Sequence, residues 1–414
     1  MKIFYLSIFT LFLIKSATYQ SKAHILKVCA SCNYTTITGA VRDAKAGDSV
    51  IVEKGNYFER DITITKPIFL IGIGYPVIDG ESGGEIITVE SDSVTIAGFQ
   101  IQNVGTSYIK DQAGIQVKGK YCQVLDNVLL NTFFGIYLQK AHFTLIQNNR
   151  ITGKAINQIS SGNAIHVWDS KNIKVLNNEV RNHRDGIYLE FVDESLIENN
   201  ISEYNLRYGL HFMFSNDDDY LNNVFRDNGA GVAVMFSRNI QMIGNTFDHN
   251  WGSSSYGLLL KEIYDGKIEK NTFSQNTIGI YGESANRIII ERNTFMNNGW
   301  ALKILGSCMD NVISGNNFSG NTFNLSTNAR KNYNIYDGNY WSDYTGYDLN
   351  RDGIGDVPYR PVKLYAYLVE TVPTSILLLR SMFTEFLNFA EKVNPTFTPE
   401  GLIDQSPQMK KFDL

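Results

Sequence analysis

The residues best suited to chemistry are one histidine and two methionines in two neighbouring segments of similar apolar pattern. "GLHFM" contains His211 and Met213, and "GVAVM", about one repeat later, ends in Met235. If each segment is a strand and Leu210 and Phe212 face the core, the histidine and methionine side chains point outward from one face. An imidazole and two thioethers form a soft donor set that suits Cu(I) and is poor for calcium or magnesium. The sequence therefore predicts a copper site on an outward strand face.

The same pattern has a simpler interpretation, in which outward methionine and histidine side chains only pack beneath a covering loop or a partner. Tyr188 and Glu190 precede these residues by one repeat, so we expect them beside the site. His166, two repeats earlier in the same outward column, and His249, in an insertion, are weaker candidate ligands.

A second candidate metal site lies in "DLNRDGIGD". Asp348, Asn350 and Asp352 occupy positions 1, 3 and 5 of a calcium loop, glycine follows at position 6, and Asp356 stands at position 9. Position 12 is a tyrosine instead of the usual glutamate, and no paired helices flank the loop. The alternative is an Asp/Gly turn whose side chains bond to their own backbone. We predict a calcium loop here, with the turn as the competing interpretation.

The run "NDDDY", with aspartates at positions 217 to 219, offers carboxylates at a coil corner. Such a cluster could bind calcium or supply the acid and base of a glycosidase. We favour an acidic turn exposed to solvent. A lyase or hydrolase groove also needs acidic and basic groups that face each other over adjacent repeats, and only Arg184, Asp185 and Glu190 offer a mixed set of that kind.

The cysteines indicate an exported protein with one small disulfide. Cys29 and Cys32 in "VCASC" are predicted to pair near the mature N-terminus. Zinc normally needs four ligands and a redox dithiol is expected near a βαβ pattern, which is missing here, so both alternatives rank lower. Cys122 and Cys308 lie within strand-like repeats and are expected to be buried thiols.

An internal repeat positions all these residues. "GIQV", "GIYL", "GLHF" and "GVAV" recur between positions 114 and 282, in step with asparagines that begin "N-x-apolar" segments. Asparagine tolerates the left-handed backbone of a sharp corner, and stacked amides can bond along a column. Two strand segments per repeat with tight turns predict one coil of a parallel β-helix. The asparagines stand at positions 127, 149, 178, 200, 223, 245, 271, 293, 316 and 339, and seven of the nine intervals are 22 or 23 residues.

Composition agrees with an all-β fold. The 34 glycines, 23 tyrosines and 24 phenylalanines favour strands and turns over helices. The net charge of -5, with lysines and arginines scattered along the chain, excludes a nucleic-acid partner.

Helices are expected only at the two ends. A short amphipathic helix at residues 36–45 would cover the open end of the first coil. A helix that begins near Pro373 would carry an apolar face, which either folds back onto the last coil or docks on a membrane partner. The expected segments are a signal peptide at 1–23, with an uncleaved anchor as the alternative, the capped β-helix at 24–340, the calcium-like loop at 341–362 and a helical tail at 363–414.

Several segments are more particular than the repeat. They are "RYGLHFMFS", "YGLLLKEI" and the stretch from "GNYWSDYTGYDLNRDGIGDVPYRPVKLYAYLVETVPTSILLLRS" to "PEGLIDQSP". These segments resemble the NosD family of periplasmic copper-binding maturation proteins for nitrous oxide reductase, and the likeness spans nearly the whole mature chain. The resemblance implies a single right-handed, pectin-lyase-like β-helix in the periplasm, associated with an inner-membrane complex. It also implies an ABC transporter partner with an ATPase and a permease, a copper chaperone as donor, and nitrous oxide reductase as client. The tail at 364–393 would then meet the permease.

The leading hypothesis is a non-catalytic assembly scaffold that receives copper or holds the apo client. The competing hypothesis is a secreted polysaccharide lyase or hydrolase on the same fold, which would need an acid/base pair in a groove lined with sugar-stacking aromatics. A carbohydrate-binding protein without a metal is a third hypothesis. It would use the outward tyrosines Tyr137, Tyr188 and Tyr281 and would survive loss of the methionines.

Overall fold

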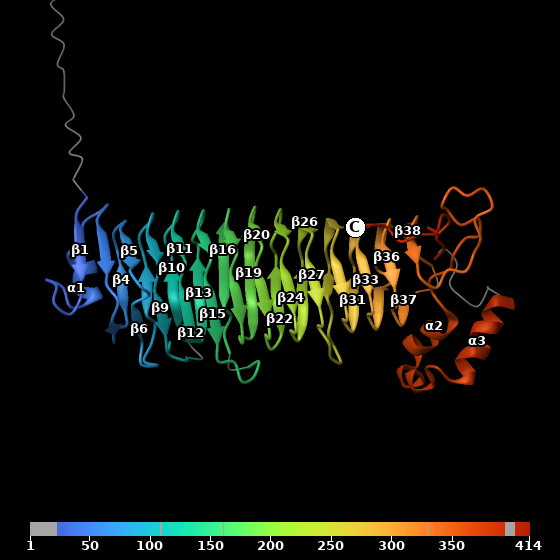
Figure 1. Cartoon of the computed structure of the whole chain (residues 1–414), viewed down its shortest axis with the longest axis horizontal. Helices are drawn as coiled ribbons and strands as arrows, with labels where there is room; N and C mark the ends of the chain where they lie inside the picture. Colours follow the sequence, from blue (N-terminus) through green and yellow to red (C-terminus); the bar gives the residue numbers. More distant parts are fainter. Residues whose placement is uncertain (1–22, 108–109, 160, 330, 394–401) are drawn as a thin grey trace, which may run out of the picture.

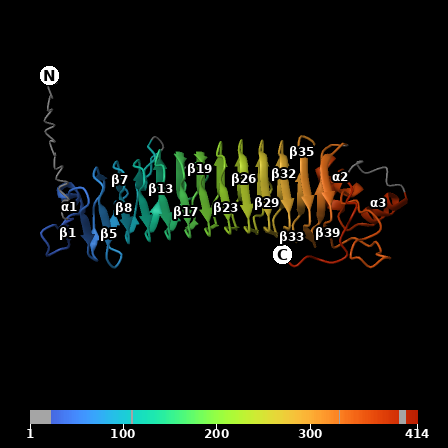
Figure 2. The same ribbon diagram turned by 90° about the horizontal axis from the view of Figure 1, so that it is seen from above.

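The chain winds into one long rod of stacked coils (Figures 1 and 2). Each complete coil contributes one strand to each of three sheets, here called A, B and C, in which neighbouring strands run parallel. The predicted single parallel β-helix is therefore confirmed. The predicted signal peptide, apart from its last residue, lies outside the part of the chain that is described. This computed structural model describes residues 23–107, 110–159, 161–329, 331–393 and 402–414.

In each coil, the strand of sheet A comes directly before the turn that carries the repeated asparagine, here called the asparagine corner. Its strands, in spatial order, are β1 (Ile25–Val28), β2 (Ser49–Val52), β5 (Phe69–Gly72), β8 (Thr95–Ala97), β11 (Gln123–Leu125), β14 (Leu145–Gln147), β17 (Lys174–Leu176), β20 (Leu196–Glu198), β23 (Asp219–Leu221), β26 (Arg238–Ile243), β29 (Tyr264–Glu269), β32 (Asn286–Glu291), β35 (Met309–Ser314) and β38 (Tyr333–Asp337).

Sheet B follows the asparagine corner. Its strands are β3 (Asn56–Tyr57), β6 (Val77–Asp79), β9 (Gln100–Gln102), β12 (Val128–Thr132), β15 (Arg150–Gly153), β18 (Glu179–Arg181), β21 (Ile201–Glu203), β24 (Val224–Arg226), β27 (Thr246–Asp248), β30 (Thr272–Ser274), β33 (Thr294–Met296), β36 (Asn317–Ser319) and β39 (Tyr340–Trp341).

Sheet C carries the "GIYL"-type segments. Its strands are β4 (Ile62–Ile64), β7 (Ile87–Val89), β10 (Ala113–Val117), β13 (Phe134–Gln139), β16 (Ile165–Lys171), β19 (Asp185–Asp193), β22 (Tyr208–Met213), β25 (Ala230–Met235), β28 (Leu258–Lys261), β31 (Ile278–Glu283), β34 (Trp300–Ile304) and β37 (Phe323–Ser326).

The core is a set of continuous columns, because side chains at one register position stack from coil to coil. In sheet B the inward position holds a phenylalanine in several successive coils, and the rings of Phe247, Phe273 and Phe295 stack with centroids 4.5 and 4.8 Å apart. In sheet C, Ile136 and Leu138 are fully buried, as the alternation predicts. Burial of these columns supplies the apolar contribution to stability, and each coil completes the core of its neighbours.

The asparagine ladder at the corner between sheets A and B fixes the register of the coils. The side-chain oxygen of Asn200 accepts bonds from the backbone N–H and the side-chain amide of Asn178, at 2.9 and 3.0 Å. The Asn200 amide in turn donates to Asn223 at 2.9 Å and to the carbonyl of Val175 at 2.8 Å. The left-handed backbone belongs to the preceding residue, Asn199, at φ 56°. Asn199 thus takes the left-handed backbone and Asn200 makes the stacked amide bonds, whereas the sequence pattern assigns both roles to one asparagine.

The two ends of the rod are capped differently. The helix α1 (Ile37–Asp43) covers the first coil within the predicted range, and the Thr36 side chain caps it by accepting from the Gly39 N–H at 3.3 Å. At the other end, the expected single helix from Pro373 is wrong. The chain forms α2 (Leu364–Thr371), a 3₁₀ helix η1 (Pro373–Leu378) and α3 (Met382–Val393), and it turns between the last two at Arg380, whose φ is 64°.

The chain end returns to the rod as a clasp, which we define as residues 402–414 (Figure 1). Asp404 occupies the next place in the asparagine ladder and accepts from the backbone N–H and side-chain amide of Asn339, at 2.9 and 3.1 Å. The indole N–H of Trp341 donates to the same carboxylate oxygen at 2.9 Å. The C-terminal segment is therefore only partly helical, because its end completes the ladder.

Asp218 is buried inside the coil, although the sequence favours an acidic turn exposed to solvent. Its carboxylate accepts the Ser195 N–H at 2.8 Å and the Tyr220 hydroxyl at 3.3 Å. Burial raises the pKa of Asp218 well above its usual range, although these two donors act to lower it. The expectation is wrong because the middle aspartate occupies an inward column, while its neighbour Asp217 is exposed.

The raised pKa of Asp218 predicts that the unfolding free energies of the wild type and of Asp218→Asn differ by an amount that depends on pH. The stability that the protonated group contributes is fully present below the unfolded-state pKa of about 3.9 and is lost as pH rises through the folded-state pKa. Asp218→Asn cannot ionise, so it should match the wild type near pH 4 and become progressively more stable than it towards pH 8, as urea unfolding would measure. Asp217→Asn, at the exposed neighbouring position, is the matched control. A constant difference for Asp218→Asn would contradict the prediction.

Candidate metal site

The predicted copper ligands lie on the outward face of β19, β22 and β25, which we call the outer wall. Leu210 and Phe212 are fully buried, so the alternate side chains of β22 point outward. The parallel register pairs Met213 with Met235 on the next strand and His211 with Ala233. The two methionines are therefore on neighbouring rungs, whose strands lie about 4.8 Å apart.

His211 is enclosed at the wall, with only 5% of the residue exposed. Its Nδ1 lies 3.2 Å from Nη2 of Arg207 and 3.9 Å from a carboxylate oxygen of Asp185. Its other ring nitrogen, Nε2, is buried and has no hydrogen-bond partner. An unpaired buried nitrogen is unfavourable unless something absent from the bare chain satisfies it.

Asp185 supplies a buried negative charge behind the imidazole. Arg207 holds the carboxylate in a two-point contact, at 2.8 Å from Nε and 2.5 Å from Nη2. Burial acts to raise the pKa of Asp185, but its interactions with the nearby His211 and with the hydrogen-bonded Arg207 outweigh this effect and lower the pKa to about 2. A carboxylate on one side of an imidazole with the other ring nitrogen open is the arrangement that orients metal-binding histidines.

The tautomer of His211 connects these contacts to metal binding. If Nδ1 carries its proton towards Asp185, the lone pair sits on Nε2, as a metal ligand requires. If Nδ1 instead accepts from Arg207, the proton sits on Nε2 and finds no acceptor. The donor set fits a soft cation in the first tautomer, since neutral imidazole and thioether donors favour Cu(I).

Tyr188 packs between the two histidines of the same outward column. Its hydroxyl lies 3.9 Å from the Met213 sulfur, and its ring centroid lies 4.9 Å from that of His211. His166 stacks on the far side of Tyr188 at 4.8 Å, and burial lowers the pKa of His166 to about 3, so it is neutral. The structure therefore keeps His166 away from the methionine pair.

Of the two other residues considered for the site, Glu190 lies beside it and His249 does not. Glu190 pairs in register with Met213, so it does lie beside the site. His249 follows a strand of sheet B and contacts Asp227 at 2.6 Å, so the structure does not bring it to the outer wall.

A row of three stacked aromatic rings borders the wall, and the sequence analysis missed it. Phe191, Phe214 and Phe236, here called the phenylalanine ladder, stack with centroids 5.2 and 5.0 Å apart. Phe191 and Phe214 are 47% and 40% exposed, and all three residues have φ between 51° and 55°. Bulky residues are uncommon in this left-handed conformation. The sequence signal is a phenylalanine directly after each outward residue, in "EF", "MF" and "MF".

The predicted calcium loop forms a self-bonded turn. Asp348 accepts the backbone N–H groups of Arg351, Asp352 and Gly353, at 2.6, 3.2 and 2.9 Å. Asp352 and Asp356 likewise accept backbone N–H groups, and the Asn350 amide bonds to Asp352. Within the described residues, the loop carboxylates do not bring three ligand atoms within 4.8 Å of one another. Calcium binding at this loop stays a prediction.

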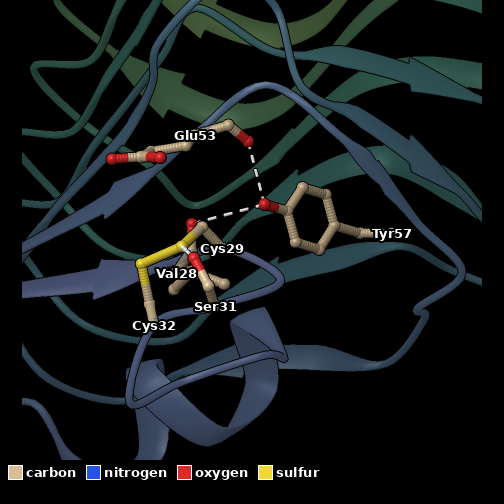
Figure 3. The surroundings of a disulfide bond; sticks show 6 residues. All are labelled: Val28, Cys29, Ser31, Cys32, Glu53 and Tyr57. Atoms are coloured by element: carbon tan, nitrogen blue, oxygen red, sulfur yellow. Dashed lines mark hydrogen bonds between the residues drawn. A yellow bond between two sulfur atoms is a disulfide. The ribbon is translucent and has the colours of Figure 1, made fainter.

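Cys29 and Cys32 form the disulfide that their spacing indicates (Figure 3). Cys122 and Cys308 are buried free thiols.

The carbohydrate-binding hypothesis requires exposed aromatic rings on which a sugar can stack. The ring of Tyr137 is partly covered, because it lies between the rings of Phe134 and His166, with centroids 5.7 and 4.6 Å away.

Comparisons with known proteins identify the fold and the family of this chain. Two solved sugar-active enzymes share the fold alone. The family 28 exopolygalacturonase of Yersinia enterocolitica is 12% identical, with a TM-score of 0.59 over 77% of this chain and 78% of its own. The GH87 α-1,3-glucanase of Streptomyces thermodiastaticus is 16% identical, with a TM-score of 0.58 over 75% of this chain and 67% of its own.

Sequence relatives are more specific. The profile described as "Periplasmic copper-binding protein (NosD)" matches residues 148–346, which include the outer wall. Proteins named "Probable ABC transporter binding protein NosD" are 30% identical in Pseudomonas aeruginosa, over 84% of this chain and 86% of theirs, and 28% identical in Stutzerimonas stutzeri, over 85% of each. None of the helices among the described residues has the length and apolar character needed to span a membrane. The chain belongs to the NosD family, which is described as a family of periplasmic copper-binding proteins.

Proposed function

We propose that this chain is a periplasmic accessory protein that binds Cu(I) on its outer wall. In this role it works with an ABC transporter to assemble the copper centre of nitrous oxide reductase. The observation that carries the proposal is the buried, unpartnered Nε2 of His211 on the same face as the paired thioethers of Met213 and Met235. The family description and the names of the relatives support a copper cargo and a transporter partner.

The donor chemistry suits a metal carrier. Imidazole and thioether donors are neutral and soft, so they discriminate in favour of Cu(I) without a large electrostatic hold on it. The ionised Asp185 lies behind the imidazole and would orient His211 while leaving the cation to the soft donors. The chain would thus hold the ion firmly enough to select it and loosely enough to pass it on.

A protein that exchanges copper with this wall must approach it closely, and the phenylalanine ladder is placed for that contact. Phe214 and Phe236 directly follow the two candidate methionine ligands in the chain. Coils outside the ladder place Lys140, Asp169 or Glu262 at the same kind of left-handed corner. Exposed aromatic rings in a strained backbone conformation contribute little to folding, so we assign the ladder to docking of the copper chaperone or of the reductase.

The helical end of the rod offers a separate surface for the permease or the adjoining membrane. In η1 and α3, Leu377 and Met382 are 86% and 91% exposed, and Phe386 and Phe389 are also exposed. The opposite side of this module is anchored, because Tyr365, Ala366 and Val369 of α2 pack on Phe323 of the last coils. Several large exposed apolar side chains in one small module favour an interaction site there. With the transporter at this end, the outer wall would remain accessible along the side of the rod.

The copper proposal predicts a selective effect of the two methionines. Met213→Leu combined with Met235→Leu keeps the apolar volume and removes both thioethers, so Cu(I) affinity should fall at least about tenfold. Titration of the purified chain against a chromophoric Cu(I) chelator would measure it. Met309→Leu, an exposed methionine on sheet A, is the matched control and should bind as the wild type does. Equal affinity in all three proteins would rule out the wall as the copper site.

The docking proposal predicts that a substitution in the phenylalanine ladder weakens partner binding without lowering the stability of the fold. Phe214→Asn removes the central ring and introduces a residue that tolerates positive φ, so the unfolding free energy should stay unchanged or rise by about 1 kcal/mol. Surface plasmon resonance should show at least about tenfold weaker binding to the copper chaperone or the apo reductase. Phe143→Asn is the control, because Phe143 is exposed, has φ 59° and stacks on Tyr121 at another corner. Unchanged binding of both partners to Phe214→Asn would contradict the assignment.

A further inference from the structure

A second pair of soft donors lies at the N-terminal end of the rod, in the turn that follows β1. Cys29 and Cys32 are joined by the disulfide, and Cys32 is partly exposed (Figure 3). From β1 to β23, which follows β22 of the outer wall in the chain, sheet A advances eight rungs, so the two places are roughly 40 Å apart. The disulfide is thus remote from the methionine pair and can act independently of it.

The backbone closes this turn without help from the disulfide. The Cys29 N–H donates to the Tyr34 carbonyl at 3.1 Å, and the Cys32 N–H donates to the Cys29 carbonyl at 3.2 Å. Val28 also forms a parallel bridge with Tyr34. A disulfide stabilises mainly by restricting the unfolded chain, and this effect is small when only two residues separate the cysteines. The turn therefore has backbone closure of its own, and the sulfur–sulfur bond adds less stability than one that closes a long loop.

A carboxylate completes the group. A Glu53 carboxylate oxygen and the two sulfur atoms lie within 4.8 Å of one another, and no other cluster of three such ligand groups occurs in the described ranges. The Tyr57 hydroxyl lies 2.8 Å from the Glu53 carbonyl and 3.3 Å from the Val28 carbonyl, so it ties the two backbone segments together (Figure 3). The backbone would thus keep the sulfurs and the carboxylate close after the sulfur–sulfur bond is broken.

We propose that Cys29 and Cys32 form a redox-gated binding site for a soft monovalent cation such as Cu(I). In the oxidised state the sulfurs bond to each other and offer no thiolate. In the reduced state they offer two thiolates, which are the strongest soft donors that a protein has. The site goes beyond the methionine wall, because its occupancy would depend on the supply of a thiol reductant and not only on the supply of copper.

The gating step is a thiol–disulfide exchange with an external dithiol. A thiolate of the dithiol attacks the Cys32 sulfur, the bond to Cys29 breaks, and the Cys29 sulfur leaves as a thiolate and takes a proton. The second thiol of the donor then displaces Cys32, which also takes a proton. Two electrons and two protons pass to the pair, and the donor becomes a disulfide. Cu(I) then displaces the two thiol protons, and Glu53 is placed to accept one of them.

The experiment compares oxidised and reduced full-length mature protein in which Met213→Leu and Met235→Leu remove the thioethers of the wall. One sample is reduced with an excess of a dithiol, freed from it without oxygen, and titrated with Cu(I) against a chelator. The reduced sample should bind one more equivalent than the oxidised sample and show thiolate-to-Cu(I) absorption in the ultraviolet. Cys29→Ser with Cys32→Ser should abolish the difference, and Cys122→Ser should preserve it.

Three results would overturn the proposal. They are equal Cu(I) stoichiometry in the two redox states, failure of excess dithiol to reduce the pair in the folded protein, and loss of the far-ultraviolet circular dichroism spectrum on reduction. The proposed copper site on the outer wall is tested separately, by Cu(I) titration of the oxidised protein with its methionines intact. Either site can therefore fail while the other stands.

Discussion

The asparagine ladder between sheets A and B is the interaction on which the rest of the structure depends. Each buried amide accepts from the coil before it and donates to the coil after it, as Asn200 does between Asn178 and Asn223. Both partners are removed from water, so a slip of one residue in a coil would leave several donors and acceptors unpaired. The ladder therefore makes the register of every coil costly to change, and a fixed register is what brings side chains from separate coils together.

The outer wall is a direct consequence of that register. Met213 and Met235 are 22 residues apart in the chain but share one position on adjacent strands. The imidazole of His211 is fixed from behind by Asp185 and Arg207, which come from two successive coils. A rigid rod also keeps the phenylalanine ladder beside these candidate ligands and holds the apolar helices at one end. Under the proposed function, the fold would separate a face for copper from an end for the transporter.

The sequence predicts the features that repeat and misses those that depend on distant or unusual contacts. The period, the inward and outward alternation and the pairing of Met213 with Met235 follow from local patterns. The burial of Asp218 does not, because an acidic run indicates a surface until its column is known. The capping role of Asp404 is equally hidden, since its partner Asn339 is 65 residues away. The orphaned Nε2 of His211 depends on where Asp185 and Arg207 lie, which no single segment reveals.

The most direct test of the copper wall is X-ray absorption at the copper and selenium edges. The sample is selenomethionine-labelled protein with an intact disulfide and one equivalent of Cu(I). Copper held by His211, Met213 and Met235 should show selenium neighbours and a nitrogen neighbour, and the selenium signal should vanish when residues 213 and 235 are leucine. Copper surrounded only by oxygen or nitrogen, or a copper–selenium signal that survives both substitutions, would contradict the assignment.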